Sequence, residues 1–449
     1  MLLPHNNISI NLKCQQFVCE SIVFNDELGY VEIPFESKQD TKEICCPECC
    51  NGVEIYDNYT VMLKDMPIWQ GENQYVSARV HRYRCPRCGK TFTEEIPMKY
   101  PGTRITDRAA CWIRELLRWR LPISAVREIT GIHWDTIRKI HMEIMEDALE
   151  TRRKELKKAG YKPKYLAIDE FAIHKGHKYA TCVMDLEQGD VIWVGIGRSM
   201  PDFNVFFSEV DMDYLSEVKA IAMDMNASYN RLVAFYMPNV EIVYDRYHTQ
   251  AQFGKDVLGS VRLYEAHAHQ NRAKEIDALV SEEPDPAVRK QLRLQAKEQR
   301  HLYSKLKSSR WTLLKNSSNL DENKAEALNA ILSDHSDLAV CYAMKEEMCE
   351  LFELRDAEVA RKRWQLWFEA AKTSGIAPLV KFAELKEKRI DGLVAHASFP
   401  ISTGKLEGFN NKIKVAKRIG YGYRNLPYFF SLIKYLTIPD VRFPSPKIP

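Results

Sequence analysis

The 449-residue sequence has no run of about 18 apolar residues, the length that a membrane-spanning helix requires. Its first residues, MLLPHNNISINLKC, lack a basic region followed by an apolar one, so we expect no secretory signal. Internal repeats and low-complexity tracts are also missing. Hydrophobic residues make up 45% of the chain, which excludes a largely disordered protein. These features predict a soluble, intracellular protein, and the length allows about two to four domains.

A strong net charge is missing as well. Lys and Arg number 64 against 61 Asp and Glu, so the formal charge of +3 does not by itself indicate a nucleic-acid-binding protein. The basic residues are clustered, however: residues 289–310 hold eight Lys or Arg and one Glu, and residues 405–424 hold six and one. Surfaces that bind phosphates concentrate positive charge in this way. A solvated helix face explains the first cluster equally well.

The twelve cysteines do not indicate a disulfide-rich secreted domain, because the chain is neither small nor expected to be secreted. Four of them form two pairs with the two-residue gap of zinc knuckles, and these are Cys46 with Cys49 and Cys85 with Cys88. Such a gap lets a tight turn direct both thiolates at one metal, and four thiolates make a closed structural zinc site. Cys45 and Cys50 leave the register of the first pair open. A redox dithiol is the alternative.

Residues 121–141 show the pattern of two helices joined by a turn that contains Gly131. Val126 and Ile129 are expected on the buried side of the first helix. The length and polarity match a DNA-binding helix-turn-helix, whose second helix enters the major groove. An ordinary helical hairpin is the alternative, and a preceding zinc ribbon favours DNA binding. Five exposed polar residues would then face bases or phosphates, namely Asp135, Thr136, Arg138, Lys139 and His141.

The segment 165–250 predicts three hairpin-linked strands followed by two strands flanked by helices, the order of the ribonuclease H architecture. The first and fourth strands are neighbours in that fold, so Asp169 in the first and Asp224 at the end of the fourth would lie side by side. Buried carboxylates are costly unless paired or bound to a cation, and Mg²⁺ prefers oxygen ligands. Glu407, among basic and amide residues, is the best third acid. A surface salt bridge is the alternative for each acid taken alone.

Residues 255–395 are expected to be almost entirely helical and highly charged. A loop of this length inside a catalytic domain is unusual unless it is a folded module. Trp364 and Trp367 are expected in its core, with stacking on an unpaired base as the alternative. Four basic residues are expected to contact DNA phosphates, namely Arg289, Lys290, Arg293 and Lys297.

Several short motifs occur in a specific order along the chain. They are Arg82-Tyr83-Arg84-Cys85-Pro86-Arg87-Cys88, Thr91-Phe92-Thr93-Glu94, the helical pair of residues 121–141, Ala167-Ile168-Asp169-Glu170, Met223-Asp224-Met225, Asp245-Arg246-Tyr247-His248, Arg310-Trp311-Thr312-Leu313-Leu314-Lys315-Asn316, Leu406-Glu407-Gly408 and residues 417–424. With these motifs the chain resembles, over almost its whole length, the bacterial insertion-sequence transposases of the IS-L-three family. Those proteins carry a DDE catalytic domain.

The resemblance implies that Asp169, Asp224 and Glu407 are the catalytic triad and the ligands of Mg²⁺ or Mn²⁺, with Asp245 and His248 in support. Asp245 competes with Asp224 for the place of the second acid, but it ends the fifth strand, one strand further from Asp169. The family commonly has Asn-Gly shortly before the glutamate, where this chain has Ser-Thr-Gly. Four further basic residues would bind DNA, namely Lys412, Lys414, Lys417 and Arg418.

The predicted fold is multidomain α+β. Its parts are a zinc-ribbon domain in 1–100, a helix-turn-helix DNA-binding domain in 101–155, a ribonuclease H-like α/β catalytic domain with a mixed five-stranded sheet in 160–254 and 396–440, and an all-helical insertion in 255–395.

The predicted protein is a cytoplasmic, nucleoid-associated DNA transposase with structural Zn²⁺. It would bind terminal inverted repeats, cleave them with Mg²⁺ and join the ends to target DNA. Its expected partners are double-stranded DNA and further copies of the chain, because two ends must be held together. A structure-specific ribonuclease H-like nuclease and a DNA-binding regulator derived from a transposase are the alternatives.

Overall fold

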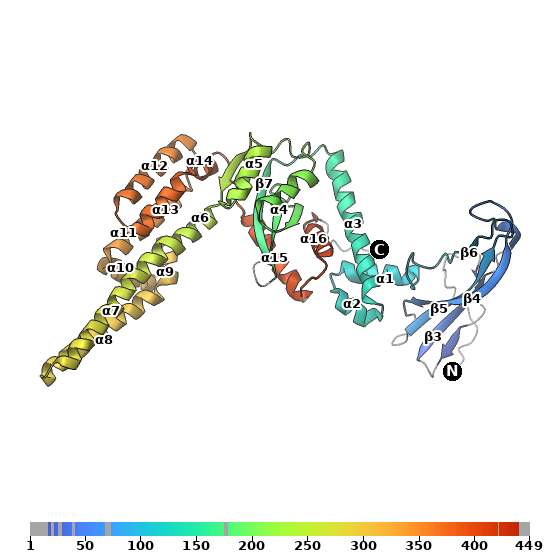
Figure 1. Ribbon diagram of the computed structural model, residues 1–449, viewed down its shortest axis with the longest axis horizontal. Coiled ribbons are helices and arrows are strands. Elements are labelled where there is room, and N and C mark those ends of the chain that lie inside the picture. Colours follow the sequence, from blue (N-terminus) through green and yellow to red (C-terminus); the bar gives the residue numbers. More distant parts are fainter. Residues whose placement is uncertain are drawn as a thin grey trace. The chain divides into compact units, whose positions relative to one another are not determined.

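The computed structural model describes residues 17–18, 22–25, 29–37, 41–67, 73–174, 178–420 and 422–439. The protein is α+β, with two mixed sheets and many helices (Figure 1), and this class agrees with the prediction. The chain forms two compact units: residues 1–152 with 419–432, and residues 153–418 with 433–449. No helix in the described ranges is long and apolar enough to cross a membrane.

The first unit contains a six-stranded sheet of order β1-β3-β5-β4, with β2 paired to β3 and β6 to β5. Its elements are β1 (Phe17–Val18), β2 (Val23–Asn25), β3 (Tyr30–Ser37), η1 (Thr41–Glu43), β4 (Glu54–Asp65), β5 (Asn73–Arg84) and β6 (Thr91–Thr93). Strands β4 and β5 form a long antiparallel hairpin. Ile33, Leu63 and Val76 belong to one buried core, as expected where alternate side chains point to one face.

Three helices follow this sheet: α1 (Asp107–Arg118), α2 (Ile123–Thr130) and α3 (Trp134–Lys158). Gly131 ends α2 with a φ of +60°, a left-handed conformation that suits glycine, so the predicted pair of helices with its turn is present. The prediction of a buried Ile129 is wrong, because its side chain is 51% exposed. The buried face of α2 instead contains Ile123, Val126 and Thr130, at helical spacing.

The second unit contains a five-stranded sheet of order β11-β10-β7-β8-β9. Its strands are β7 (Tyr165–His174), β8 (Lys178–Asp185), β9 (Val191–Ile196), β10 (Ala220–Met223) and β11 (Glu241–Tyr244). Strands β7, β10 and β11 are parallel, whereas β7, β8 and β9 are antiparallel. The first and fourth strands of this sheet, β7 and β10, are neighbours, as predicted.

Helices α4 (Met200–Glu209) and α5 (Ala227–Tyr236) pack on one face of this sheet (Figure 1). Leu166 and Ile168 of β7 face these helices and pack with Phe203 and Val233. Asp169, one residue further on, therefore points to the opposite face, because successive side chains of a strand alternate. That face receives α15 (Gly404–Ile419), and α16 (Leu426–Tyr435) is the last described helix.

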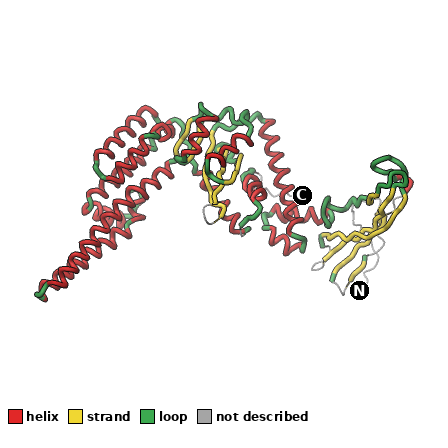
Figure 2. Tube along the Cα trace, viewed as in Figure 1, coloured by secondary structure: helices red, strands yellow, loops and turns green. Residues whose placement is uncertain are grey.

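From α6 to η4 the chain is helical (Figure 2). These elements are α6 (Arg246–Phe253), η2 (Gly254–Leu258), α7 (Gly259–Glu282), α8 (Pro286–Ser308), α9 (Arg310–Leu314), η3 (Ser317–Asn319), α10 (Glu322–Asp334), α11 (Ser336–Leu351), α12 (Ala357–Thr373), α13 (Ala377–Glu387), α14 (Ile390–Val394) and η4 (Ala395–Ala397). Helices α7 and α8 lie side by side as a long antiparallel pair. Trp364 and Trp367 are fully buried in the core of the segment, so their predicted place in a core is confirmed.

Candidate functional site

Three aspartates stand at the same level on the three parallel strands of the second sheet. Met223 of β10 aligns with Ile168 of β7 on one side and with Tyr244 of β11 on the other. The residues that follow these three are Asp224, Asp169 and Asp245. The aspartates therefore come together at one edge because the strands run parallel and in this register.

Asp169 is mostly buried, with 13% of its side chain exposed. Its Oδ1 accepts a hydrogen bond from the backbone N–H of Glu170 at 2.8 Å, and its Oδ2 accepts one from Nδ2 of Asn410 at 2.8 Å. Burial raises the pKa of Asp169 to about 6, and the negative charge of Glu407 acts in the same direction. A buried carboxylate of this kind is costly to charge, and a bound cation would offset that cost.

Glu407 reaches the site from α15, and His248 reaches it from α6. Nε2 of His248 lies 3.6 Å from Oε1 of Glu407 and 4.0 Å from Oδ1 of Asp169. Burial raises the pKa of Glu407, and the charge of Asp245 raises it further. The imidazole of His248 therefore stands close to both acids, which belong to different elements.

Asp245 is buried, and both of its carboxylate oxygens are used by backbone N–H groups. Its Oδ1 accepts from Tyr247 at 2.7 Å and from His248 at 3.3 Å, which caps the N-terminus of α6. Its Oδ2 accepts from the backbone N–H of Thr403 at 2.8 Å, just before α15. Asp245 thus connects the start of the helix that carries His248 to the start of the helix that carries Glu407.

Asp224 is exposed at the end of β10, and its Oδ1 accepts a hydrogen bond from the backbone N–H of Met225 at 2.6 Å. The carboxylate oxygens of Asp169, Asp224 and Glu407 do not all lie within 4.8 Å of one another. Within the described part of the chain, a group of three or more acidic, histidine or cysteine side chains that meets this distance occurs only at four cysteines. His248 lies close to both Asp169 and Glu407, whereas Asp224 follows β10, the strand next to β7.

Nε2 of His248 makes no hydrogen bond but lies near the two acids, whereas the buried Oδ1 of Asn410 has no hydrogen-bond donor among the described residues. Unsatisfied buried polar atoms are rare, and each suggests a partner that the protein itself does not supply. The amide oxygen of Asn410 and the carboxylates of Asp169 and Glu407 are hard oxygen donors. They fit a divalent cation such as Mg²⁺. Sequence reasoning did not assign Asn410, although its place three residues after Glu407 on a helix was visible.

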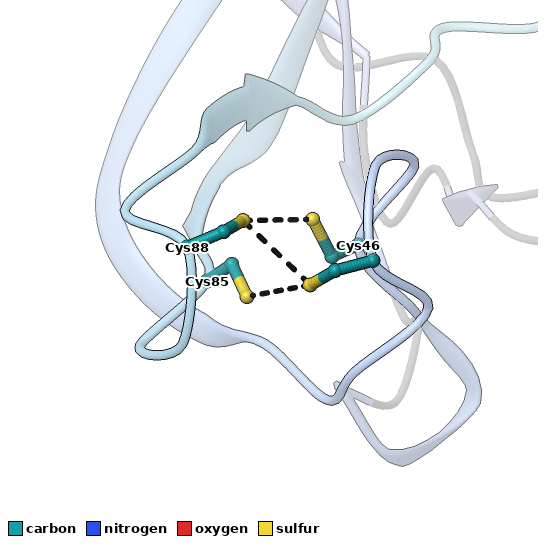
Figure 3. A group of neighbouring side chains, drawn as sticks. Cys46, Cys85 and Cys88 are labelled. Carbon is teal, nitrogen blue, oxygen red and sulfur yellow. Dashed lines mark hydrogen bonds between the residues drawn. The ribbon is translucent and has the colours of Figure 1, made fainter.

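The four predicted zinc ligands are brought together in the first unit. The Sγ atoms of Cys46, Cys49, Cys85 and Cys88 all lie within 4.8 Å of one another. Figure 3 shows three of them, Cys46, Cys85 and Cys88, with their sulfur atoms directed toward a common centre. The side chain and backbone of Asn51 lower the pKa of the Cys49 thiol to about 6, which favours the thiolate that binds metal. Four converging thiols suit zinc, so this cluster could hold one ion.

The two cysteine turns have the same backbone hydrogen bonds. The N–H of Cys46 donates to Asn51 O and the N–H of Cys50 donates to Cys46 O, at 2.8 and 2.9 Å. In the second turn the N–H of Cys85 donates to Lys90 O and the N–H of Gly89 donates to Cys85 O, again at 2.8 and 2.9 Å. Cys50 therefore occupies the position of Gly89, and both have a left-handed φ, +53° and +74°. Cys45 and Cys50 lie outside the group of four sulfurs.

The residues of α3 that were expected to face DNA differ in exposure. Asp135 and Lys139 are exposed, whereas Thr136 and Arg138 are half-buried. His141 is also half-buried, and its Nδ1 lies 2.7 Å from the hydroxyl of Tyr428. Burial lowers the pKa of His141 to about 4. The expectation of an exposed His141 is therefore wrong, because its ring packs edge-on against the ring of Tyr428.

The basic residues of α15 and α8 that were expected to bind DNA also differ in how far their side chains are exposed. Lys412, Lys414 and Arg418 are exposed, whereas Lys417 is half-buried and donates to the carbonyl of Ala172. Of the four basic residues of α8 that were expected to contact DNA, Lys290, Arg293 and Lys297 are exposed, and helical spacing places them on one face. Arg289 instead donates to the carbonyl of Pro284 at 3.3 Å.

Comparisons with known proteins point to one family. The profile of a family described as transposase, of the DDE type and the IS-L-three group, matches residues 166–433. The chain is 32% identical over 400 residues to the transposase for insertion sequence element IS1001 of Bordetella parapertussis. The aligned region covers 88% of this chain and 89% of that protein. It is 23% identical over 405 residues to the transposase for insertion sequence element IS1557 of Mycobacterium tuberculosis, and the aligned region covers 88% of this chain and 86% of that protein. The chain therefore belongs to the IS-L-three family of DDE transposases, enzymes that act on DNA and use divalent metal ions.

Proposed function

We propose that this transposase binds the terminal inverted repeats of its own insertion sequence, cleaves the DNA at these ends with Mg²⁺ or Mn²⁺ and joins the ends to target DNA. Asp169, Asp224 and Glu407 are the proposed catalytic triad. The observation that carries this proposal is the approach of Glu407 and Asn410, on one face of α15, to Asp169 on β7. Parts of the chain more than 200 residues apart thereby contribute to one acidic site.

The proposed catalytic domain is ribonuclease H-like and contains residues 160–254 and 396–440, with the helical residues 255–395 inserted between its parts. Two features support this proposal. Strand order β9-β8-β7-β10-β11 combines an antiparallel hairpin series with two parallel strands, the order expected for this fold. The parallel register sets Asp169 and Asp224 on adjacent strands.

Mg²⁺ ions held by the three acids would activate the attacking oxygen and stabilise the leaving oxygen of a phosphodiester. The other residues prepare this site. Asn410 fixes the orientation of the Asp169 carboxylate through its amide N–H. Asp245 is a positioning residue, because its oxygens hold the N-termini of α6 and α15. His248 lies beside Asp169 and Glu407, where its ring nitrogen can pair with either carboxylate.

The first unit is the proposed end-recognition part, with a zinc ribbon in 1–100 and a helix-turn-helix in 101–155. The converging thiols of Cys46, Cys49, Cys85 and Cys88 support a structural Zn²⁺. Asp135 and Lys139 present exposed side chains on α3 for contact with DNA. Exposed Lys412, Lys414 and Arg418 would add phosphate contacts next to the active site. Because two ends must be cut together, the active form is proposed to be a dimer or a higher oligomer in the bacterial cytoplasm.

The test uses the purified full-length chain and linear DNA with the terminal repeats of the element. Specific cleavage at the repeat ends that requires Mg²⁺, followed by joining of the 3′ ends to a second DNA, is the expected result. DNA of the same length with scrambled repeats is the control. Cleavage of branched DNA regardless of the repeats would identify a structure-specific nuclease. Specific binding without cleavage under any divalent metal would identify a regulator.

A further inference from the structure

The loop that carries Asp224 is short and is held from two sides. On the sheet side, Nδ2 of Asn226 donates to Oε1 of Glu170 at 3.1 Å, and Oδ1 of Asn226 caps α5 by accepting from Ser228. On the other side the contacts come from α13 and the turn after it, about 160 residues further along the chain. Met225, next to Asp224, makes both of these distant contacts.

Lys386 of α13 is buried, with 4% of its surface exposed. Its Nζ donates to Sδ of Met225 at 2.9 Å and to Oε1 of Gln252 at 2.6 Å. Burial lowers the pKa of Lys386 to about 8, and the negative charge of Asp224 opposes this decrease. Lys386 has no salt bridge among the described residues, and a buried ammonium without one is costly, so its place beside the loop of an acidic site calls for an explanation.

Arg389 follows α13 and donates from Nη1 to the backbone carbonyl of Met225. Gly392 of α14 stands against the ring of Tyr244, and a Cβ on this glycine would lie 2.4 Å from that ring. The absence of a side chain at Gly392 therefore lets α14 approach the end of β11 closely. The segment that contains Lys386 and Arg389 is thus anchored on the strand that adjoins β10.

We propose that Lys386 and Arg389 are positioning residues for Asp224, so that the helical insertion, residues 255–395, determines where the second acid of the active site stands. The proposal rests on the proposed function, in which Asp224 binds a divalent cation. Lys386 holds the side chain of Met225, the residue next to Asp224, and is itself held by Gln252. Arg389 fixes the backbone of the same residue. Mg²⁺ requires nearly ideal octahedral geometry, so a displaced Asp224 would bind it poorly.

The experiment measures how cleavage of repeat-end DNA depends on Mg²⁺ concentration, for the full-length chain and four variants. Lys386→Met removes the charge and both hydrogen bonds while it keeps the length of the side chain. Arg389→Gln removes the hydrogen bond to Met225. Lys386→Arg keeps the charge and is the conservative variant. Lys381→Met is the matched control, because Lys381 lies on the same helix and is exposed.

Lys386→Met and Arg389→Gln are expected to raise the Mg²⁺ concentration for half-maximal cleavage about tenfold or more, the size of effect seen when residues that support metal ligands are replaced. Affinity for the repeat DNA and the thermal unfolding midpoint should stay near wild type for both variants. Lys386→Arg should recover most of the Mg²⁺ response, and Lys381→Met should match wild type.

Unchanged Mg²⁺ curves for both test variants would overturn the proposal, as would an equal shift in the control. If Lys386→Met does not fold, Arg389→Gln decides alone. A wild-type chain that fails to cleave at every Mg²⁺ concentration would overturn the proposed function, and this inference with it.

Discussion

Asn410 donates a hydrogen bond from Nδ2 to Oδ2 of Asp169 at 2.8 Å, across a sequence separation of 241 residues. Glu407 precedes Asn410 by three residues, so both side chains lie on one face of α15. The bond therefore orients the carboxylate of Asp169 and also keeps the Glu407 face of the helix against β7.

Replacing Asn410 with Ala should slow DNA cleavage about 10- to 100-fold, the usual cost of losing a residue that orients a metal ligand. The expected cause is a free rotation of the Asp169 carboxylate, so binding of repeat DNA should not change. Steady-state cleavage and binding assays on the purified variant measure both quantities. Asn411→Ala, at the exposed neighbouring position, is the control. Wild-type cleavage by Asn410→Ala would remove this residue from the site.

The strands of the site were predictable from the sequence because their signals are local. Apolar runs indicate a strand with Asp169 at its centre and a strand that ends at Asp224, and the observed pairing of β7 with β10 agrees with the prediction that these strands are neighbours. The contact of Asn410 with Asp169 was not predictable, because helical spacing does not reveal which polar residue of a helix faces a distant strand. Lys386 was missed for the same reason. A helical pattern gives no register between α13 and the loop after β10.

Two local predictions were wrong for physical reasons that the sequence contains only in part. Ile129 is apolar, but the buried face of α2 passes through Ile123, Val126 and Thr130, which leaves Ile129 exposed. His141 lies on the second helix of the helix-turn-helix pair, yet it packs against Tyr428, which comes from the last described helix. Neither the phase of a short helix nor a partner almost 300 residues away follows from the pattern.

The purified protein should contain one Zn²⁺ per chain at Cys46, Cys49, Cys85 and Cys88, and Cys50→Gly should keep it. Glycine should also raise the stability of the first unit by about 1 kcal/mol, because Cys50 has a left-handed φ that costs about that much for a residue with a Cβ. Elemental analysis and thermal unfolding of the full chain measure these effects. Gly89→Ala should have the opposite effect on stability. Loss of zinc from Cys50→Gly would show that Cys50 is a ligand.

The stability of the first unit should decrease as pH falls from about 6.5 to 4, in part because of His141. Burial lowers the pKa of His141 to about 4 in the folded chain, whereas an unfolded chain binds this proton near pH 6.5. Between these two pH values the unfolded state thus binds more protons than the folded state. The neutral His141 therefore contributes on the order of 3 kcal/mol to the free energy of unfolding above about pH 6.5, and this contribution is lost as the pH falls to about 4. His141→Phe should flatten this part of the pH profile in denaturant unfolding. An unchanged profile would contradict a His141 that stays neutral in the folded chain over this pH range.

The exposed basic face of α8 should contact DNA phosphates. Replacing Lys290, Arg293 and Lys297 with Ala should weaken binding to repeat and non-repeat DNA alike. The slope of log affinity against log salt should decrease by about 0.9 for each phosphate that the variant no longer neutralises. Titrations of DNA affinity at several salt concentrations measure the slope. The control is the triple variant Lys290→Arg, Arg293→Lys and Lys297→Arg, which keeps all three positive charges. An unchanged slope would place this face in solvent or against another subunit.

The most direct test of the proposed active site compares cleavage of repeat-end DNA by Asp169→Asn, Asp224→Asn and Glu407→Gln. Each replacement keeps the shape of the side chain and removes the charge that is proposed to hold Mg²⁺, so each variant should bind repeat DNA with an affinity near wild type and show no detectable cleavage. Asp245→Asn should keep measurable activity, because Asp245 uses its oxygens to hold two helices. Cleavage at a wild-type rate by any of the three variants, or activity of Asp224→Asn together with an inactive Asp245→Asn, would contradict the assigned triad.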